Sequence, residues 1–325
     1  MQAFTLIRPQ SLDAALAAGA KDGAKYIAGG SDLMQLGKDD VERPREIVDL
    51  EGLVPATITL EGGALRLGAL ARMSDVAANA DVRRAWPAVS EALLASASQQ
   101  IRNMGTMGGN LLQRTRCSYF RDTGFACNKR APGSGCPAIP GENRQLGVIG
   151  ISAHCIATHP SDMPVALMAM DASVELLAPS GIKRTVPLAE FYRLPGDTPH
   201  IETNLLPGEV IAAIIVPPSA AAAKSRYLKI RDRASFEFAV VSAAVALSVE
   251  DGVVRQVGIA LGGVAPRPWR LPQVEAALQG QPATDETFRT AAAFASQGAQ
   301  PASGNAFKVK LMQRAVFRGL QMAAA

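Results

Sequence analysis

All four cysteines of this 325-residue chain lie between residues 117 and 155, in a stretch rich in glycine and proline. Residues 112–156 show neither the two-residue alternation of a strand nor the 3.6-residue period of a helix. A loop of this length is uncommon inside a compact domain unless something orders it. The chain must therefore fold around an ordering element in this segment, and the four thiols are the first candidates.

The cysteine spacing is C-x9-C-x8-C-x18-C, and three explanations compete for it. Two disulfides suit small secreted domains, whereas this chain is large and shows no signal peptide. Zinc sites usually contain close C-x-x-C pairs, which are absent. Four thiolates on long segments suit an iron–sulfur cluster, whose bulk separates its ligands. The spacing favours a cluster and leaves zinc, disulfides and unrelated thiols open.

Basic side chains surround the cysteines. Arg114, Arg116, Arg121, Lys129 and Arg130 would offset the negative charge of a cluster held by four thiolates. A solvated loop would explain the same residues. They support the cluster only together with the cysteines.

The composition is that of a folded protein with two or three domains, since 48% of the residues are hydrophobic and 19% are charged. The net charge of +4 comes from scattered basic residues, so we do not expect a nucleic acid partner. No window reaches 18 apolar residues, and the N-terminus lacks a twin-arginine pair, so we expect neither a membrane span nor an export signal on this chain.

The order of the expected elements predicts a mixed α+β architecture. Short strands, helices and hairpins around Gly62-Gly63 and Pro179–Gly181 alternate up to a linker at residues 219–226. A long hairpin turning at Asp251-Gly252 and then helices follow. We predict a domain at 1–220, with subdomains 1–56 and 57–220 and an insertion at 112–156, and a second domain at 225–325.

Two glycine turns could bring backbone N–H groups to phosphate oxygens. "AGGSDL" (Ala28–Leu33) follows an apolar strand, and "GTMGGNLL" (Gly105–Leu112) is the second turn. Each is also an ordinary turn. Because G-x-G-x-x-G is absent from a βαβ unit, the sequence argues against a Rossmann domain.

Two polar segments have equally simple alternatives. "THPSDMP" could cap the helix that follows it, through Ser161 or Asp162. "KIRDRASFEFA", beginning at Lys229, could be the polar edge of a strand.

Together, the segments resemble a known family, the FAD-binding medium subunits of the molybdenum hydroxylases, such as xanthine dehydrogenase and carbon monoxide dehydrogenase. The matching segments, in chain order, are "AGGSDL", "IRNMGTMGGN", "ATHPSDMPVAL", "KIRDRASFEFAVVS" and "GGVAPRPWR". The chain departs from most of the family because 46 residues, which include all four cysteines, separate Asn110 from Ala157. "QRTRC", "CNKRAPGSGC" and "CIATHPSDM" resemble the subgroup of periplasmic aldehyde oxidoreductases whose flavin subunit also carries a [4Fe-4S] cluster.

The resemblance implies a two-part FAD-binding domain of the vanillyl-alcohol-oxidase/PCMH type and a smaller α+β C-terminal domain. It implies that the first turn holds the FAD pyrophosphate, through Ala28, Gly29, Gly30, Ser31, Asp32 and Leu33. Further FAD contacts would come from Thr106, Gly109, Asn110, Ser161, Asp162 and Lys229. The cluster ligands would be Cys117, Cys127, Cys136 and Cys155. Because His154, His159 and His200 all follow residue 150, we predict non-covalent FAD.

The function that the resemblance implies is electron transfer, with no catalytic residue on this chain. A large subunit with a molybdenum cofactor would oxidise an aldehyde, and a small subunit with two [2Fe-2S] clusters would complete a heterotrimer. An external acceptor would reoxidise the flavin. The small subunit's twin-arginine signal would carry this chain to the periplasm, with the cytoplasm as the alternative. A flavin subunit of a hydroxybenzoyl-CoA reductase-like complex and a zinc-stabilised binding module without flavin remain as other functions.

Overall fold

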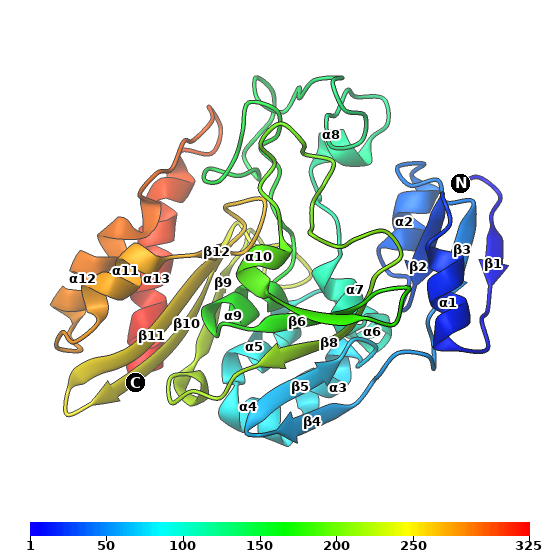
Figure 1. Ribbon diagram of the computed structural model, residues 1–325. Coiled ribbons are helices and arrows are strands. Elements are labelled where there is room, and N and C mark those ends of the chain that lie inside the picture. The colour runs from blue at the N-terminus through cyan, green and yellow to red at the C-terminus, as the bar shows by residue number, and fades with distance from the viewer.

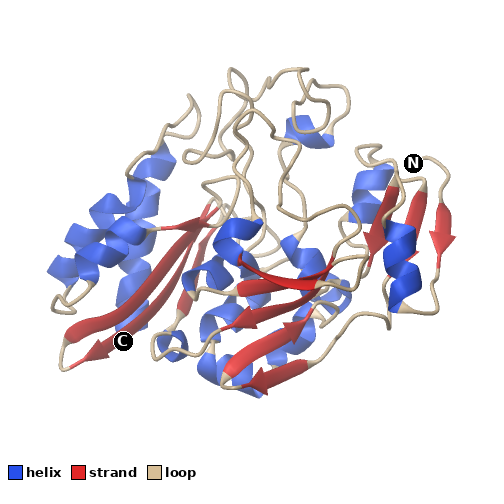
Figure 2. Ribbon diagram, viewed as in Figure 1, coloured by secondary structure: helices blue, strands red, loops and turns tan.

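The computed structural model describes residues 1–325, whose strands form three sheets (Figures 1 and 2). The first sheet is parallel, in the order β1-β3-β2. Its strands are β1 (Thr5–Ile7), β2 (Ala24–Ile27) and β3 (Glu46–Asp49), and its helices are α1 (Leu12–Gly19) and α2 (Leu33–Lys38). Ser11 is the N-cap of α1, because its hydroxyl accepts from the backbone N–H of Ala14 at 3.2 Å.

The second sheet is antiparallel, in the order β4-β5-β8-β6-β7. Its strands are β4 (Ile58–Glu61), β5 (Ala64–Gly68), β6 (Ser173–Leu177), β7 (Lys183–Pro187) and β8 (Val210–Val216). Gly62 and Gly63 both adopt positive φ angles in the first hairpin, which matches the prediction from the Gly-Gly pair. The second predicted hairpin is also present, between β6 and β7.

A group of short helices lies beside this second sheet (Figure 1). They are α3 (Met73–Ala78), α4 (Ala80–Ala85), α5 (Pro87–Ala95), α6 (Gln99–Met104), α7 (Met107–Leu111), α9 (Met163–Ala169) and α10 (Leu188–Phe191). Pro87 is the first residue of α5, where its missing N–H costs no hydrogen bond. The proline therefore marks the boundary between α4 and α5.

The third sheet is antiparallel, in the order β12-β11-β10-β9. Its strands are β9 (Arg226–Ile230), β10 (Val241–Glu250), β11 (Val253–Gly262) and β12 (Trp269–Arg270), and its helices are α11 (Pro272–Leu278), α12 (Asp285–Ala292), η2 (Ala293–Ser296) and α13 (Phe307–Ala324). Strand β10 is buried on both faces: Ala243 and Val245 pack into the C-terminal core, whereas Ala244 and Ala246 join the main core of the N-terminal part. None of the helices combines the length and the apolar character that crossing a bilayer requires.

The segment 112–156 contains a single helix, α8 (Ser118–Arg121), and no strand. It forms the irregular loops at the top of Figure 1, between the N-terminal and C-terminal parts. The predicted linker at 219–226 differs from a solvated connection, since it holds the 3₁₀ helix η1 (Ala222–Lys224) and buries Ala222 in the main core. Alanine side chains are small enough to pack there, which composition alone did not reveal.

Candidate functional site

A cleft of about 770 Å³ opens between the glycine turns, the segment 112–156 and the loop after β9. Small-molecule sites span about 300–1,000 Å³, so the cleft has the size of a cofactor site. All twelve residues predicted to contact FAD line it. They are Ala28, Gly29, Gly30, Ser31, Asp32, Leu33, Thr106, Gly109, Asn110, Ser161, Asp162 and Lys229.

The first glycine turn touches the second. A Cβ atom added to Gly29 would lie 2.0 Å from the carbonyl oxygen of Met104, and Gly30 has a φ angle of +69°. Only glycine meets both demands without displacing backbone. The two turns therefore approach one another closely, and both present their backbone to the cleft.

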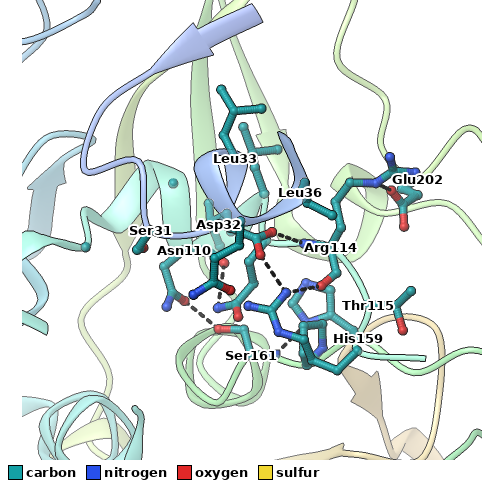
Figure 3. A pocket seen from close by; sticks show the side chains of 18 of the residues that line it. Ser31, Asp32, Leu33, Leu36, Asn110, Arg114, Thr115, His159, Ser161 and Glu202 are labelled. Atoms are coloured by element: carbon teal, nitrogen blue, oxygen red, sulfur yellow. Dashed lines mark hydrogen bonds and ion pairs between the residues drawn. The ribbon is translucent and has the colours of Figure 1, made fainter. Parts of the chain in front are cut away.

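The side chains around the second turn are already engaged with one another (Figure 3). The hydroxyl of Thr106 accepts from the backbone N–H of Gly109 at 3.3 Å, and so caps the short helix α7. The hydroxyl of Ser161 donates to the side-chain oxygen of Asn110, in a contact drawn in Figure 3. This bond joins the turn to the N-terminal end of α9, although 51 residues separate its two partners.

The carboxylate of Asp32 lines the cleft but is hydrogen-bonded to residues of segment 112–156, called the cysteine segment from here on. It accepts from Arg116 at 2.6 Å, from Arg121 at 2.9 Å and from the backbone N–H of Arg114 at 2.8 Å. Burial raises the pKa of Asp32, and Arg116 acts in the opposite direction. Since this side chain has three donors within the protein, it is the backbone of the turn that remains to hold a phosphate.

Asp162 and Lys229 form a buried ion pair on another wall of the cleft. The ammonium group of Lys229 donates to the Asp162 carboxylate at 2.8 Å, and both side chains are at most 5% exposed. Ser96 and the Tyr227 hydroxyl also donate to this carboxylate. Asp162 is the N-cap residue of α9 but makes no side-chain cap bond. The FAD contacts of both residues stay predictions, and the pair has a structural role as well.

The cleft lining is balanced in charge. It contains six lysine or arginine side chains and six aspartate or glutamate side chains. A diphosphate would therefore be held mainly by backbone N–H groups, as the glycine turns provide, rather than by a free cluster of cations.

His159 is a cleft residue that the sequence prediction did not include. Its Nδ1 accepts from the backbone N–H of Ser161 at 3.3 Å, and its buried Nε2 has no hydrogen-bond partner. Burial lowers the pKa of His159 to about 4, so the ring is neutral and carries its proton on Nε2. Because Nε2 is fully buried, it presents no surface to a group bound in the cleft, and the backbone of Leu111 lies close enough to raise the pKa of the ring slightly against the effect of burial. His159 lies two residues before Ser161 in the segment "THPSDMP", and this closeness to a predicted FAD contact is the sequence signal that could have identified it.

A second histidine, His200, also lines the cleft. His159 and His200 therefore both line the cleft, although they lie far from the first glycine turn in the sequence. Non-covalent FAD stays a prediction.

The four cysteines line one small cavity beside the cleft. All four are free thiols, so the structure gives no support to the disulfide explanation. Burial, with a smaller contribution from the neighbouring Cys127, raises the pKa of Cys117 to about 11. Burial also raises the pKa of Cys136 and of Cys155.

No group of three or more His, Cys, Asp or Glu side chains is arranged to hold a single metal ion. A cluster of several irons keeps its ligands further apart than one ion does. The cysteine cavity therefore fits a cluster better than zinc.

Comparison with known proteins identifies the family. Residues 2–219 match the family described as the FAD binding domain in molybdopterin dehydrogenase, and residues 226–323 match the CO dehydrogenase flavoprotein C-terminal domain. The aldehyde oxidoreductase FAD-binding subunit PaoB of Escherichia coli is 50% identical over 97% of this chain and 96% of its own length. The glyceraldehyde dehydrogenase medium chain of Sulfolobus acidocaldarius is 28% identical over 92% and 89%.

A solved structure shows the same architecture. Carbon monoxide dehydrogenase from Hydrogenophaga pseudoflava matches with a TM-score of 0.76 and 27% identity, over 99% of this chain and 97% of that chain. This likeness confirms the predicted α+β architecture. Together the matches confirm the prediction made from five short segments: the chain belongs to the FAD-binding medium subunits of the molybdenum hydroxylase family.

Proposed function

We propose that this chain is the electron-transfer subunit of a heterotrimeric, molybdenum-dependent aldehyde oxidoreductase and holds both FAD and a [4Fe-4S] cluster. FAD binding follows from the family. The 50% identity to an aldehyde oxidoreductase subunit over nearly the whole chain supports the substrate class. All four cysteines line one cavity beside the cleft, and this observation is the main support for the proposed cluster.

The residues of the cleft bind and orient the flavin without reacting. The backbone of Ala28–Asp32 would hold the pyrophosphate of a non-covalent FAD. Thr106, Gly109 and Asn110 would line the second side of that site, and Ser161, Asp162 and Lys229 would shape its wall. These contacts are proposals, supported by the place of the residues around one cleft.

The cysteine segment would hold its cofactor through Cys117, Cys127, Cys136 and Cys155, each as a thiolate. Because burial raises the pKa of three of these thiols, metal binding must displace their protons, and loading would release protons to solvent. A flavin and an iron–sulfur cluster together allow two-electron oxidation to be linked to one-electron carriers. The protein contributes their placement in adjoining cavities.

Substrate oxidation would take place on a large subunit with a molybdenum cofactor, and a small subunit with two [2Fe-2S] clusters would complete the complex. An external acceptor would take electrons from the flavin. The complex would work in the periplasm, exported by the twin-arginine signal of the small subunit. We also propose the domain limits 1–220 and 225–325, with the cluster insertion at 112–156.

Co-expression with the neighbouring genes, followed by affinity purification through a tag on this chain, tests the function. The expected product is a three-subunit complex with one FAD, molybdenum and aldehyde-oxidising activity towards an artificial acceptor. A chain that purifies alone, with flavin but without molybdenum partners under these conditions, would refute the heterotrimer.

A further inference from the structure

The two cavities share a wall. Of the residues that line the cysteine cavity, only Lys129 and Ala157 also line the cleft. Lys129 is thus the one charged side chain that faces both sites. It lies between Cys127 and Cys136 in the sequence, yet its ammonium group is directed away from the surface.

The ammonium group of Lys129 is held in a fixed place. It donates to the carbonyl of Pro199 at 2.9 Å and to Glu202 at 2.8 Å, and the side chain is only 7% exposed. The other oxygen of Glu202 accepts from Arg114 at 2.6 Å. A lysine buried this far costs free energy unless it is paired, and an apolar residue would fill the space at lower cost. The pairing with Glu202 makes the burial tolerable and fixes the ammonium charge at the wall that the cleft shares with the cysteine cavity.

We propose that Lys129 is a positioning residue: its fixed positive charge raises the reduction potential of the four-thiolate cluster, and the negative charge of Glu202 lowers that potential. This inference rests on the proposed cluster. One-electron reduction adds one negative charge to the cysteine cavity. A cation held at its wall stabilises that reduced state, because net charge and exposure set the potentials of iron–sulfur centres. Glu202 keeps Lys129 in place and partly neutralises it.

Removal of the Lys129 charge and removal of the Glu202 charge should shift the reduction potential of the cluster in opposite directions. Lys129→Met leaves the Glu202 carboxylate without its lysine, so we expect the equilibrium constant for cluster reduction to fall at least tenfold, or 59 mV for one electron. Glu202→Gln leaves the ammonium charge unopposed, and the potential should rise. Lys129→Arg keeps the charge and should stay within threefold of the wild-type constant.

The measurement is a potentiometric titration of the purified complex, followed by electron paramagnetic resonance, with iron counted in each variant. Opposite shifts at unchanged iron content support the inference, because loosened packing alone would not reverse sign between the two variants. If the potential is unchanged in either charge-removing variant that retains its iron, or if both shift in the same direction, the inference is wrong. A wild-type complex without cluster iron would instead overturn the proposed function and this inference with it.

Discussion

Two adjacent glycines in the first turn meet different requirements. Gly29 allows the backbone to approach Met104, and Gly30 adopts a left-handed conformation. The sequence predicted a turn at this place from the Gly-Gly pair. It did not predict the contact with Met104, because that partner lies 75 residues away in the chain and packing alone brings it there.

Replacement of Gly29 by alanine should displace the turn. The new Cβ would meet the Met104 carbonyl at 2.0 Å, so we expect a loss of about 1–3 kcal/mol in the free energy of unfolding, together with weaker FAD retention. Thermal unfolding and flavin release, followed by fluorescence, measure both. Gly37→Ala is the matched control, since its nearest neighbour is a flexible Met1 side chain at 3.4 Å and helix propensity favours alanine. Equal stability of the two variants would contradict the close approach.

His159 should make stability depend on pH. Its pKa is lowered from 6.5 to about 4 by burial, so between these values the unfolded chain binds a proton that the folded chain does not. The free energy of unfolding therefore falls as the pH decreases through this window, by about 1 kcal/mol between pH 7 and pH 5.5. Denaturant titrations should show this contribution in the wild type and lose it in His159→Gln.

His200→Gln serves as the control for that experiment, because the His200 side chain is exposed. It should retain the wild-type pH dependence. If His159→Gln and His200→Gln show the same slope as the wild type, the His159 ring is not buried in its neutral form.

The cysteine segment shows what a sequence can and cannot reveal about an irregular element. Its lack of periodicity and its four thiols predicted an ordered insertion without regular structure.

The segment is also held by a buried polar clamp from the C-terminal side. Asn305 donates to the carbonyls of Asn143, Leu146 and Gly147, and Lys308 donates to those of Gln145, Leu146 and Gly263. No local pattern encodes such contacts, since Asn305 and Lys308 lie about 160 residues from their partners in the segment.

Truncation of the clamp should loosen the segment. Asn305→Ala leaves buried carbonyls without a donor, and we expect it to cost about 1–3 kcal/mol. Hydrogen exchange should accelerate in residues 143–147, with little change in β4 and β5. Gln300→Ala, at an exposed position nearby, should behave as the wild type. Unaltered exchange in Asn305→Ala would show that the segment is held by other contacts.

The molecule as a whole is joined across the third sheet. Strand β10 packs into two cores, and the Asp162–Lys229 pair links α9 to β9 at the same boundary. The hairpins and the mixed α+β class were predictable, because they depend on local turn chemistry and residue alternation. The order of strands in each sheet was not, because it is fixed by pairings such as that of β5 with β8, which lie far apart in sequence.

The ion pair at this boundary should be strongly coupled. Lys229→Met leaves a buried carboxylate without its cation, and Asp162→Asn leaves a buried ammonium group without its anion, so each should cost about 3–5 kcal/mol. The double variant should lose less than the sum of the two, which a double-mutant cycle of denaturant unfolding measures. Flavin occupancy of Asp162→Asn should fall as well. Additive losses would show that the two residues act independently.

The cofactor content of the purified complex tests whether the cysteines gather around iron. Cys136→Ser should remove about four irons per complex while FAD remains bound, because one ligand of the [4Fe-4S] cluster is lost and the glycine turns are untouched. Ser118→Ala, at an exposed position in the same segment, should keep both cofactors. Iron and flavin are counted in the same preparations. A Cys136→Ser complex with an iron content equal to that of the wild type would contradict the assignment of the cluster to this chain.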